Sequence, residues 1–311
     1  MLMVHVGSES GVRFPALKIG FLASALLSGA ALAQDAAKAE LPLMPLAPVN
    51  SGNEAAQPLR RLTLAAMLSE DGAAIDSGMV WRVFKPEPAA DGKLPLIATG
   101  KGGSTSFELE PGSYIVHAAF GRAGATKRIT LGGEARKESI VLDAGGLKLG
   151  AVLSGGARIP PAHLRFSIYQ GEENAEGERA LIAPDVLPDR IVRLNAGTYH
   201  IVSTYGSVNA IIRADIRVEA GKMTEASVEH KAAELTLKLV RAEGGEAMAD
   251  TAWSVVNPSG EIIKESVGAF ASLVLAEGDY TIIAKNKDKL YQKDFTVVAG
   301  RNADVEVVAG E

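Results

Sequence analysis

The residue types that most often carry out catalysis are few in this chain, and they are rarely at a useful spacing. It has five histidines and no cysteine, which excludes cysteine nucleophiles and cysteine-based zinc sites. No two histidines show a metal-binding spacing such as H-x-x-x-H, and no G-x-S-x-G nucleophile turn occurs. Lysine follows glycine at three places, but neither serine nor threonine comes next, so none is a phosphate-binding loop. The sequence therefore predicts no catalytic residue, metal site or cofactor.

The histidines and the acidic side chains have simple structural interpretations. His117 and His200 are out of phase with the apolar residues of their strands, and we expect them outside the core. His163 follows two prolines at a turn, His230 ends a strand, and His5 lies in the leader. The stretch GEENAEGE predicts a solvated hairpin loop, with loose calcium binding as the alternative, and its glutamates are Glu172, Glu173, Glu176 and Glu178.

The most uneven charge distribution lies in KNKDKLYQK, residues 285–293, which predicts a hairpin. Four lysines there accompany one tyrosine, and such a tip suits an acidic protein partner, anionic lipid headgroups or lipopolysaccharide. The alternative is edge protection, because lysines on exposed strands oppose edge-to-edge aggregation. The candidate partner-contact residues are Lys285, Lys287, Lys289, Tyr291 and Lys293.

The elements that position these residues repeat three times along the chain. LEPGSYIVHAAFG starts at Leu109, LNAGTYHIVSTYG at Leu194 and LAEGDYTIIAKNK at Leu275. An aromatic strand precedes each copy, and a strand, a glycine turn and a final strand follow it. Short strands between turn residues predict β-sandwiches, and the shared order indicates true repeats. We expect an all-β protein with three tandem seven-stranded sandwiches, at residues 60–145, 146–232 and 233–311.

Each repeat predicts the same corner between two strands. The leucine closes one strand facing inward, and the glycine makes a sharp turn with positive φ. The tyrosine starts the next strand in phase with apolar residues, so its ring lies in the core and its hydroxyl bonds the backbone. A sugar-stacking surface is the alternative role for the tyrosines. The corner residues are Leu109, Gly112, Tyr114, Leu194, Gly197, Tyr199, Leu275, Gly278 and Tyr280.

The Leu-x-x-Gly-x-Tyr pattern, clearest in LEPGSYIVHA, resembles the prealbumin-like β-sandwich group. This group includes carboxypeptidase regulatory-like modules and the Cna B-type repeats of bacterial surface proteins. The resemblance implies Greek-key, Ig-like sandwiches in an exported bacterial protein, but no particular activity. Cna B-type repeats with an internal Lys–Asn cross-link carry a glutamate four residues after this tyrosine. Here those positions are Ala118, Ser203 and Ala284, so we expect no isopeptide bond.

The N-terminal part is typical of an exported protein. Residues 1–33 contain a basic flank and an uncharged run that ends in Ala31-Leu32-Ala33, which predicts a signal peptide cleaved after Ala33. An uncleaved anchor is the alternative. Residues 34–59 are rich in alanine and proline and predict a flexible linker, with a docking peptide as the alternative. We expect a periplasmic protein without a transmembrane segment after cleavage.

The composition and the repeats limit which classes of function this protein can have. The formal net charge of −5 offers no general attraction for nucleic acid. Units of about 80 residues without disulfides are marginal alone and gain from contact with neighbours. The favoured function is a non-catalytic envelope scaffold that binds other envelope proteins. The alternative is a module that binds peptidoglycan or exopolysaccharide, and an exposed Tyr205 or Tyr291 in a concave surface would favour it.

Overall fold

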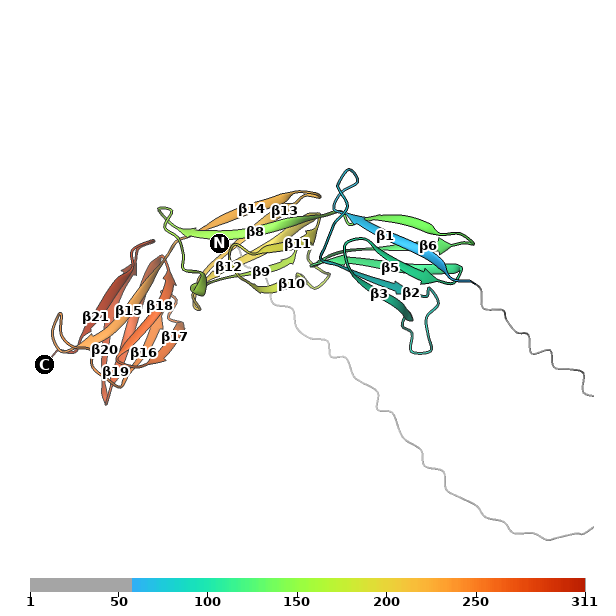
Figure 1. Cartoon of the computed structure of the whole chain (residues 1–311). Helices are drawn as coiled ribbons and strands as arrows, with labels where there is room; N and C mark the ends of the chain where they lie inside the picture. The colour runs from blue at the N-terminus through green and yellow to red at the C-terminus, as the bar shows by residue number, and fades with distance from the viewer. Residues whose placement is uncertain (1–57, 311) are drawn as a thin grey trace, which may run out of the picture. The chain divides into compact units, whose positions relative to one another are not determined.

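The computed structural model describes residues 58–310, and the strands there group into three β-sandwiches (Figure 1). This confirms the expected all-β class and the three tandem sandwiches, and with them the fold implied by the Leu-x-x-Gly-x-Tyr resemblance. The predicted signal peptide, nearly all of the predicted linker and His5 lie outside the described residues. In residues 58–310, no helix has the length and apolar character needed to cross a bilayer.

The first sandwich faces a three-stranded sheet, in the order β4-β1-β7, against a four-stranded sheet, in the order β3-β2-β5-β6. The chain changes sheet between β1 and β2, β3 and β4, β4 and β5, and β6 and β7, as expected of a Greek-key sandwich. Its strands are β1 (Arg60–Met67), β2 (Met79–Phe84), β3 (Leu96–Gly102), β4 (Thr105–Leu109), β5 (Gly112–Phe120), β6 (Ala123–Leu131) and β7 (Arg136–Val141).

The second sandwich has the same plan, with sheets in the orders β11-β8-β14 and β10-β9-β12-β13. A short 3₁₀ helix, Pro161–His163, precedes its second strand. Its strands are β8 (Ala144–Leu153), β9 (Leu164–Gln170), β10 (Leu181–Val186), β11 (Ile191–Asn195), β12 (Gly197–Tyr205), β13 (Ala210–Val218) and β14 (Met223–His230).

The third sandwich repeats the plan again, with sheets in the orders β18-β15-β21 and β17-β16-β19-β20. In each sandwich the first and last strands run parallel and all other pairs run antiparallel. Its strands are β15 (Ala232–Val240), β16 (Thr251–Val256), β17 (Ile262–Val267), β18 (Phe270–Ala276), β19 (Gly278–Asn286), β20 (Lys289–Val297) and β21 (Ala303–Val308).

Alternating side chains form the three cores. In β5, Tyr114, Val116 and Ala118 are buried while the residues between them are more exposed, because successive side chains point to opposite faces. The two tryptophans are fully buried in the first and third cores, where each indole N–H donates 2.9 Å to a backbone carbonyl, of Gly103 for Trp81 and of Gly268 for Trp253. Phe166 fills the same place in the second core and needs no such partner.

The corner of each sandwich is built around its tyrosine, as the sequence predicts. Each tyrosine is buried, and its hydroxyl donates to the backbone carbonyl four residues upstream, at 2.8, 2.8 and 3.0 Å in the three sandwiches. This bond ties the start of one strand to the end of the strand before it. The tyrosines are therefore core residues: Tyr114, Tyr199 and Tyr280.

The predicted glycine turn needs a correction. A sharp turn with positive φ is wrong for Gly112, which already belongs to β5 and has no positive φ. At Gly197 and Gly278, φ is 158° and 153°, near the extended end of the range that glycine favours. The bend lies one residue earlier, at Pro111, Ala196 and Glu277.

Very short connections join the sandwiches. Only Leu142 and Asp143 separate β7 from β8, and only Lys231 separates β14 from β15. The strand β8 begins at Ala144 and β15 at Ala232, close to the predicted starts at 146 and 233. Connections this short bring the end of one sandwich against the beginning of the next.

Candidate functional site

The predicted lysine cluster divides into a tip and a stem. The strands β19 and β20 pair up to Asn286 and Lys289, which leaves Lys287 and Asp288 as the turn. The lysine tip, defined as Lys285, Lys287 and Lys289, is exposed. The other two predicted residues belong to the stem: Tyr291 is half-buried against the third core, and the Lys293 ammonium donates to the Glu306 carbonyl at 2.7 Å.

Local contacts hold the lysine tip in place. The buried Asn286 side chain donates to the Ala249 carbonyl at 2.7 Å and to the Thr251 hydroxyl at 3.1 Å. Lys287 has φ of 54°, in the left-handed region that disfavours a residue with a Cβ. Leu290 beside the tip is 69% exposed. The third hairpin thus presents a fixed basic end next to an exposed apolar side chain.

The equivalent tips of the first two sandwiches contact the sandwich that follows. Gly121 and Gly206 occupy the position of Lys287, with φ of 66° and 72°. A Cβ on Gly121 would lie 3.0 Å from the Arg193 Cβ, and one on Gly206 would lie 2.6 Å from the Val274 Cβ. Glycine therefore permits both the backbone conformation and the close approach.

The first junction, between the first tip and the second corner, centres on Asn195. Its Oδ1 accepts from the Gly124 N–H at 3.2 Å, and its Nδ2 donates to the carbonyls of Gly124, at 3.2 Å, and Leu142, at 2.7 Å. The guanidinium of Arg193 lies 4.2 Å from the Phe120 ring centroid, a cation–π contact. The tip and the corner that meet here are both repeated elements, although the side chains that they use differ between the two junctions.

The second junction uses an asparagine from the opposite side. Asn209 on the second tip donates to the Tyr280 hydroxyl at 2.8 Å and accepts from the Ala276 N–H at 3.0 Å. Val274 joins the second core and Val208 packs against the third core. Apolar side chains thus cross this junction in both directions.

One backbone bond recurs in both junctions. The N–H of the bend residue donates to the carbonyl of the connection, from Ala196 to Asp143 at 2.7 Å and from Glu277 to Lys231 at 2.9 Å. The first corner has Pro111 at this place, and proline has no N–H to donate. The first corner therefore lacks the donor that the other two corners use.

Sequence reasoning missed a buried serine–histidine pair in the second sandwich. Ser203 Oγ and His230 Nε2 lie 2.8 Å apart, and both side chains are sealed from solvent. A hydroxyl next to an imidazole is the arrangement of an activated nucleophile, but no substrate reaches this one. The pair has a structural role in the core, because each polar group provides the hydrogen-bond partner that the other needs when buried. Ser203 stands in phase with the buried Ile201 and Tyr205, and this phase is the signal that could have revealed it.

Burial makes His230 a source of pH dependence. Loss of hydration lowers its pKa, because the charged form is costly in the core. The folded chain then holds His230 neutral while the unfolded chain takes up a proton below pH about 6.5. Stability is full above that pH and falls below it, by at most about 1.4 kcal/mol per pH unit. We expect His230→Gln to remove this dependence between pH 7 and 5 in calorimetry of the second sandwich, and His163→Gln to keep it.

The other histidines of residues 58–310 lie outside the cores. His117 Nδ1 is 3.1 Å from the Thr126 hydroxyl, and partial burial, with Arg82 nearby, lowers the pKa of the ring. His200 Nδ1 is 2.7 Å from an Asp215 carboxylate oxygen on the neighbouring strand. These pairs are on the outer faces of their sheets, as expected from the strand phase.

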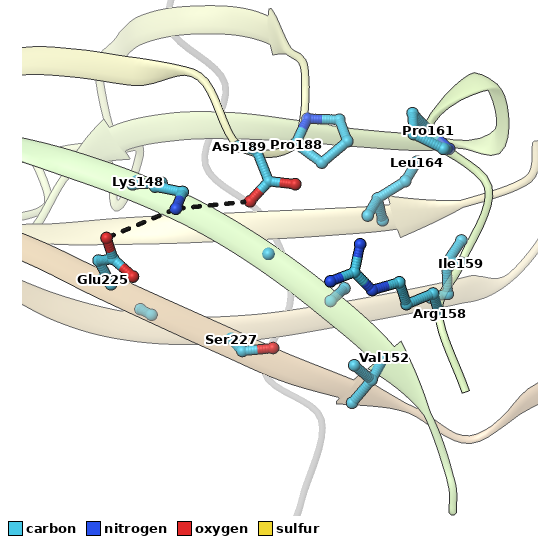
Figure 2. Close-up of a pocket in the computed structure, with 13 residues that line it drawn as sticks. Lys148, Val152, Arg158, Ile159, Pro161, Leu164, Pro188, Asp189, Glu225 and Ser227 are labelled. Atoms are coloured by element: carbon cyan, nitrogen blue, oxygen red, sulfur yellow. Dashed lines mark hydrogen bonds and ion pairs between the residues drawn. The ribbon is translucent and has the colours of Figure 1, made fainter. Parts of the chain in front are cut away.

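A hollow of about 340 Å³ lies against β8 and β14 of the second sandwich (Figure 2). Lys148 sits between two carboxylates, 3.9 Å from Asp189 and 3.5 Å from Glu225 (Figure 2). Arg158, Pro161 and Leu164 complete its far side. Lys148 is already paired with these two carboxylates, and no buried polar side chain of the described residues is left without a partner.

The glutamate loop is organised by Asn174. Its Oδ1 accepts from the N–H groups of Glu176 and Glu178, at 3.0 and 2.8 Å, while Glu173 pairs with Arg179 at 2.9 Å. Across residues 58–310, no three histidine, aspartate or glutamate side chains converge so as to hold a metal ion. The loop is held by its own hydrogen bonds.

Comparison with known proteins matches the third sandwich to a family. Residues 234–309 match a model described as the Rhizobiales growth-associated tandem repeat domain. The match covers less than half of the chain. A search of curated proteins finds no match.

Solved structures with similarity include two bacterial pilins and the Bacillus anthracis TIE protein. The Bacillus anthracis TIE protein is 17% identical, with a TM-score of 0.24, over 81% of this chain and 50% of that one. The Streptococcus agalactiae minor pilin GBS52 is 14% identical, with a TM-score of 0.29, over 55% and 95%. The Bacillus cereus major pilin subunit BcpA is 12% identical, with a TM-score of 0.22, over 80% and 99%. This chain spans half the length of the first of these proteins.

Proposed function

We propose that this protein is a non-catalytic scaffold of the bacterial cell envelope that acts in the periplasm. It binds a protein partner through the lysine tip of the third sandwich. The predicted signal peptide supports export, and the three joined sandwiches suit a protein that spaces or connects others. The third sandwich matches a family described as growth-associated, which agrees with a structural role in a growing envelope.

One observation carries this proposal. The tips at Gly121 and Gly206 each contact the sandwich that follows. The end of this hairpin therefore serves as a contact surface in the first two repeats. The lysine tip occupies the same place, and within the described residues no sandwich covers it. Three exposed ammonium groups and the exposed Leu290 give it the charge and the apolar area to bind an acidic protein surface.

In-cell cross-linking tests the proposal directly. The tagged protein is cross-linked in the envelope, recovered, and its partners are identified by mass spectrometry. We expect a specific protein with the wild type and a loss of at least about tenfold when Lys285, Lys287 and Lys289 become glutamate, because reversal turns attraction into repulsion. Lys264→Glu, on β17, is the matched control and should leave recovery unchanged. Equal recovery with the triple variant would contradict the proposal.

The glycan-binding alternative has its own outcome. Tyr205 is 1% exposed in the second core and Tyr291 is half-buried, so neither supplies the exposed ring that a sugar would stack on. If the cross-linked sample contained no partner protein and the protein pelleted with purified cell-wall sacculi, glycan binding would replace the scaffold proposal.

A further inference from the structure

The two junctions define which residues face each other when one sandwich follows another. In each, the tip residue lies against the residue just before the corner leucine: Gly121 against Arg193, and Gly206 against Val274. At the third tip, Lys287 occupies the position of Gly121 and Gly206. At the first corner, Glu108 precedes Leu109 and occupies the position of Arg193 and Val274. The two surfaces without a neighbour in residues 58–310 therefore carry opposite charges at matching positions.

The next position of the corner shows the same change. Asn195 and Ala276 follow the corner leucines of the second and third sandwiches and take part in the junctions. The first sandwich has Glu110 there. Both Glu108 and Glu110 are exposed, and Glu108 meets Arg61 at 2.8 Å on the surface. The first corner thus presents two exposed carboxylates, one of them paired with Arg61, where the corresponding residues of the other corners are uncharged or basic.

Two features imply that a contact between the third tip and the first corner would rely on surface charges rather than on close packing. Lys287 replaces a glycine. At the other two tips even a Cβ added to the glycine would lie only 2.6–3.0 Å from the facing residue, so a lysine cannot pack there as closely as glycine does. Pro111 removes the N–H that the other corners donate to a connection. Ends designed only to stop association would carry like charges, which repel. Here one end is basic and the other acidic, which favours attraction.

We propose that the lysine tip of one copy binds the acidic corner of the first sandwich of a second copy, with Lys287 facing Glu108. This inference rests on the proposed function and names its partner as the chain itself. The contact is heterologous, because different surfaces of the two copies meet, so it leaves one tip and one corner free and extends head to tail. Exposed ion pairs are weak and screened by salt, so the assembly forms at high local concentration.

Sedimentation of the purified exported protein tests this head-to-tail contact. At about 50 mM salt we expect the average mass to rise with protein concentration, and at about 500 mM salt we expect the rise to disappear. Lys287→Glu and Glu108→Lys should each abolish the rise. Mixing these two variants should restore the rise. In that mixture the unchanged tip of Glu108→Lys complements the unchanged corner of Lys287→Glu, and the two reversed surfaces also complement each other.

Matched charge reversals control for net charge. Glu87→Lys, in an exposed loop of the first sandwich, and Lys264→Glu should keep the wild-type association. The inference is overturned if the wild type stays monomeric at low salt, if Glu108→Lys associates normally, or if the two variants fail to combine. A monomeric wild type that still recovers another protein through the lysine tip would overturn this inference alone and leave the scaffold function standing.

Discussion

Replacing Trp81 by alanine is expected to unfold the first sandwich while the other two stay folded. The indole is fully buried and its N–H bonds the Gly103 carbonyl at 2.9 Å. Removing it opens a cavity in the centre of the first core, where Leu62, Tyr114 and Val116 also pack. A large aromatic residue truncated to alanine costs about 3–5 kcal/mol. That is comparable to the whole stability of a domain of this size.

Hydrogen exchange resolved by peptide measures this effect sandwich by sandwich. We expect protection to collapse in residues 60–141 and to persist in β12 and β19. Phe270→Ala is the control, because that ring is 58% exposed and its removal leaves no cavity. Equal loss of protection in all three sandwiches would show that they unfold as one unit, and unchanged protection would contradict the assignment of Trp81 to the core.

The fold was predictable because the same pattern of buried and exposed residues occurs three times along the chain. The alternation of Tyr114, Val116 and Ala118 fixes the buried face of a strand, and its recurrence in the other two copies confirms the phase. The hydroxyl bond of each tyrosine also follows, since a buried phenol near a domain edge needs a partner. These features are local in sequence, so a single chain suffices to infer them.

The contacts at the junctions and the buried Ser203–His230 pair could not be predicted from the sequence, because they join residues that are far apart along the chain. Asn195 contacts Gly124 and Leu142, which lie 71 and 53 residues away, and Ser203 meets His230 across 27 residues. No local pattern distinguishes these polar residues from solvated ones. The lysine cluster was found in the sequence by its charge. That it lies at the end of a hairpin which contacts the next sandwich in the other two repeats became visible only from the tips at Gly121 and Gly206. Its contact with a partner stays a prediction.

Replacing Asn195 by aspartate is expected to separate the first two sandwiches. The side chain accepts one hydrogen bond and donates to the carbonyls of Gly124, Leu142 and, at 3.5 Å, Asp143, and a carboxylate keeps only the accepted bond. Its negative charge would then face the Gly124 and Leu142 carbonyls at the former donor positions, within 3.2 Å. A partly buried polar group left unpaired costs about 1–3 kcal/mol, and a charged group costs more.

Limited proteolysis and calorimetry detect such a separation. We expect faster cleavage near Asp143 and a first-sandwich unfolding transition that splits from the rest, since the junction no longer couples the two cores. Asn209→Ala gives the matched control at the second junction, where cleavage should rise near Lys231 instead. If Asn195→Asp left the connection resistant, the hydrogen bonds of Asn195 would not be what holds the junction. The backbone bond from Ala196 to Asp143, which both variants retain, would then be the dominant contact.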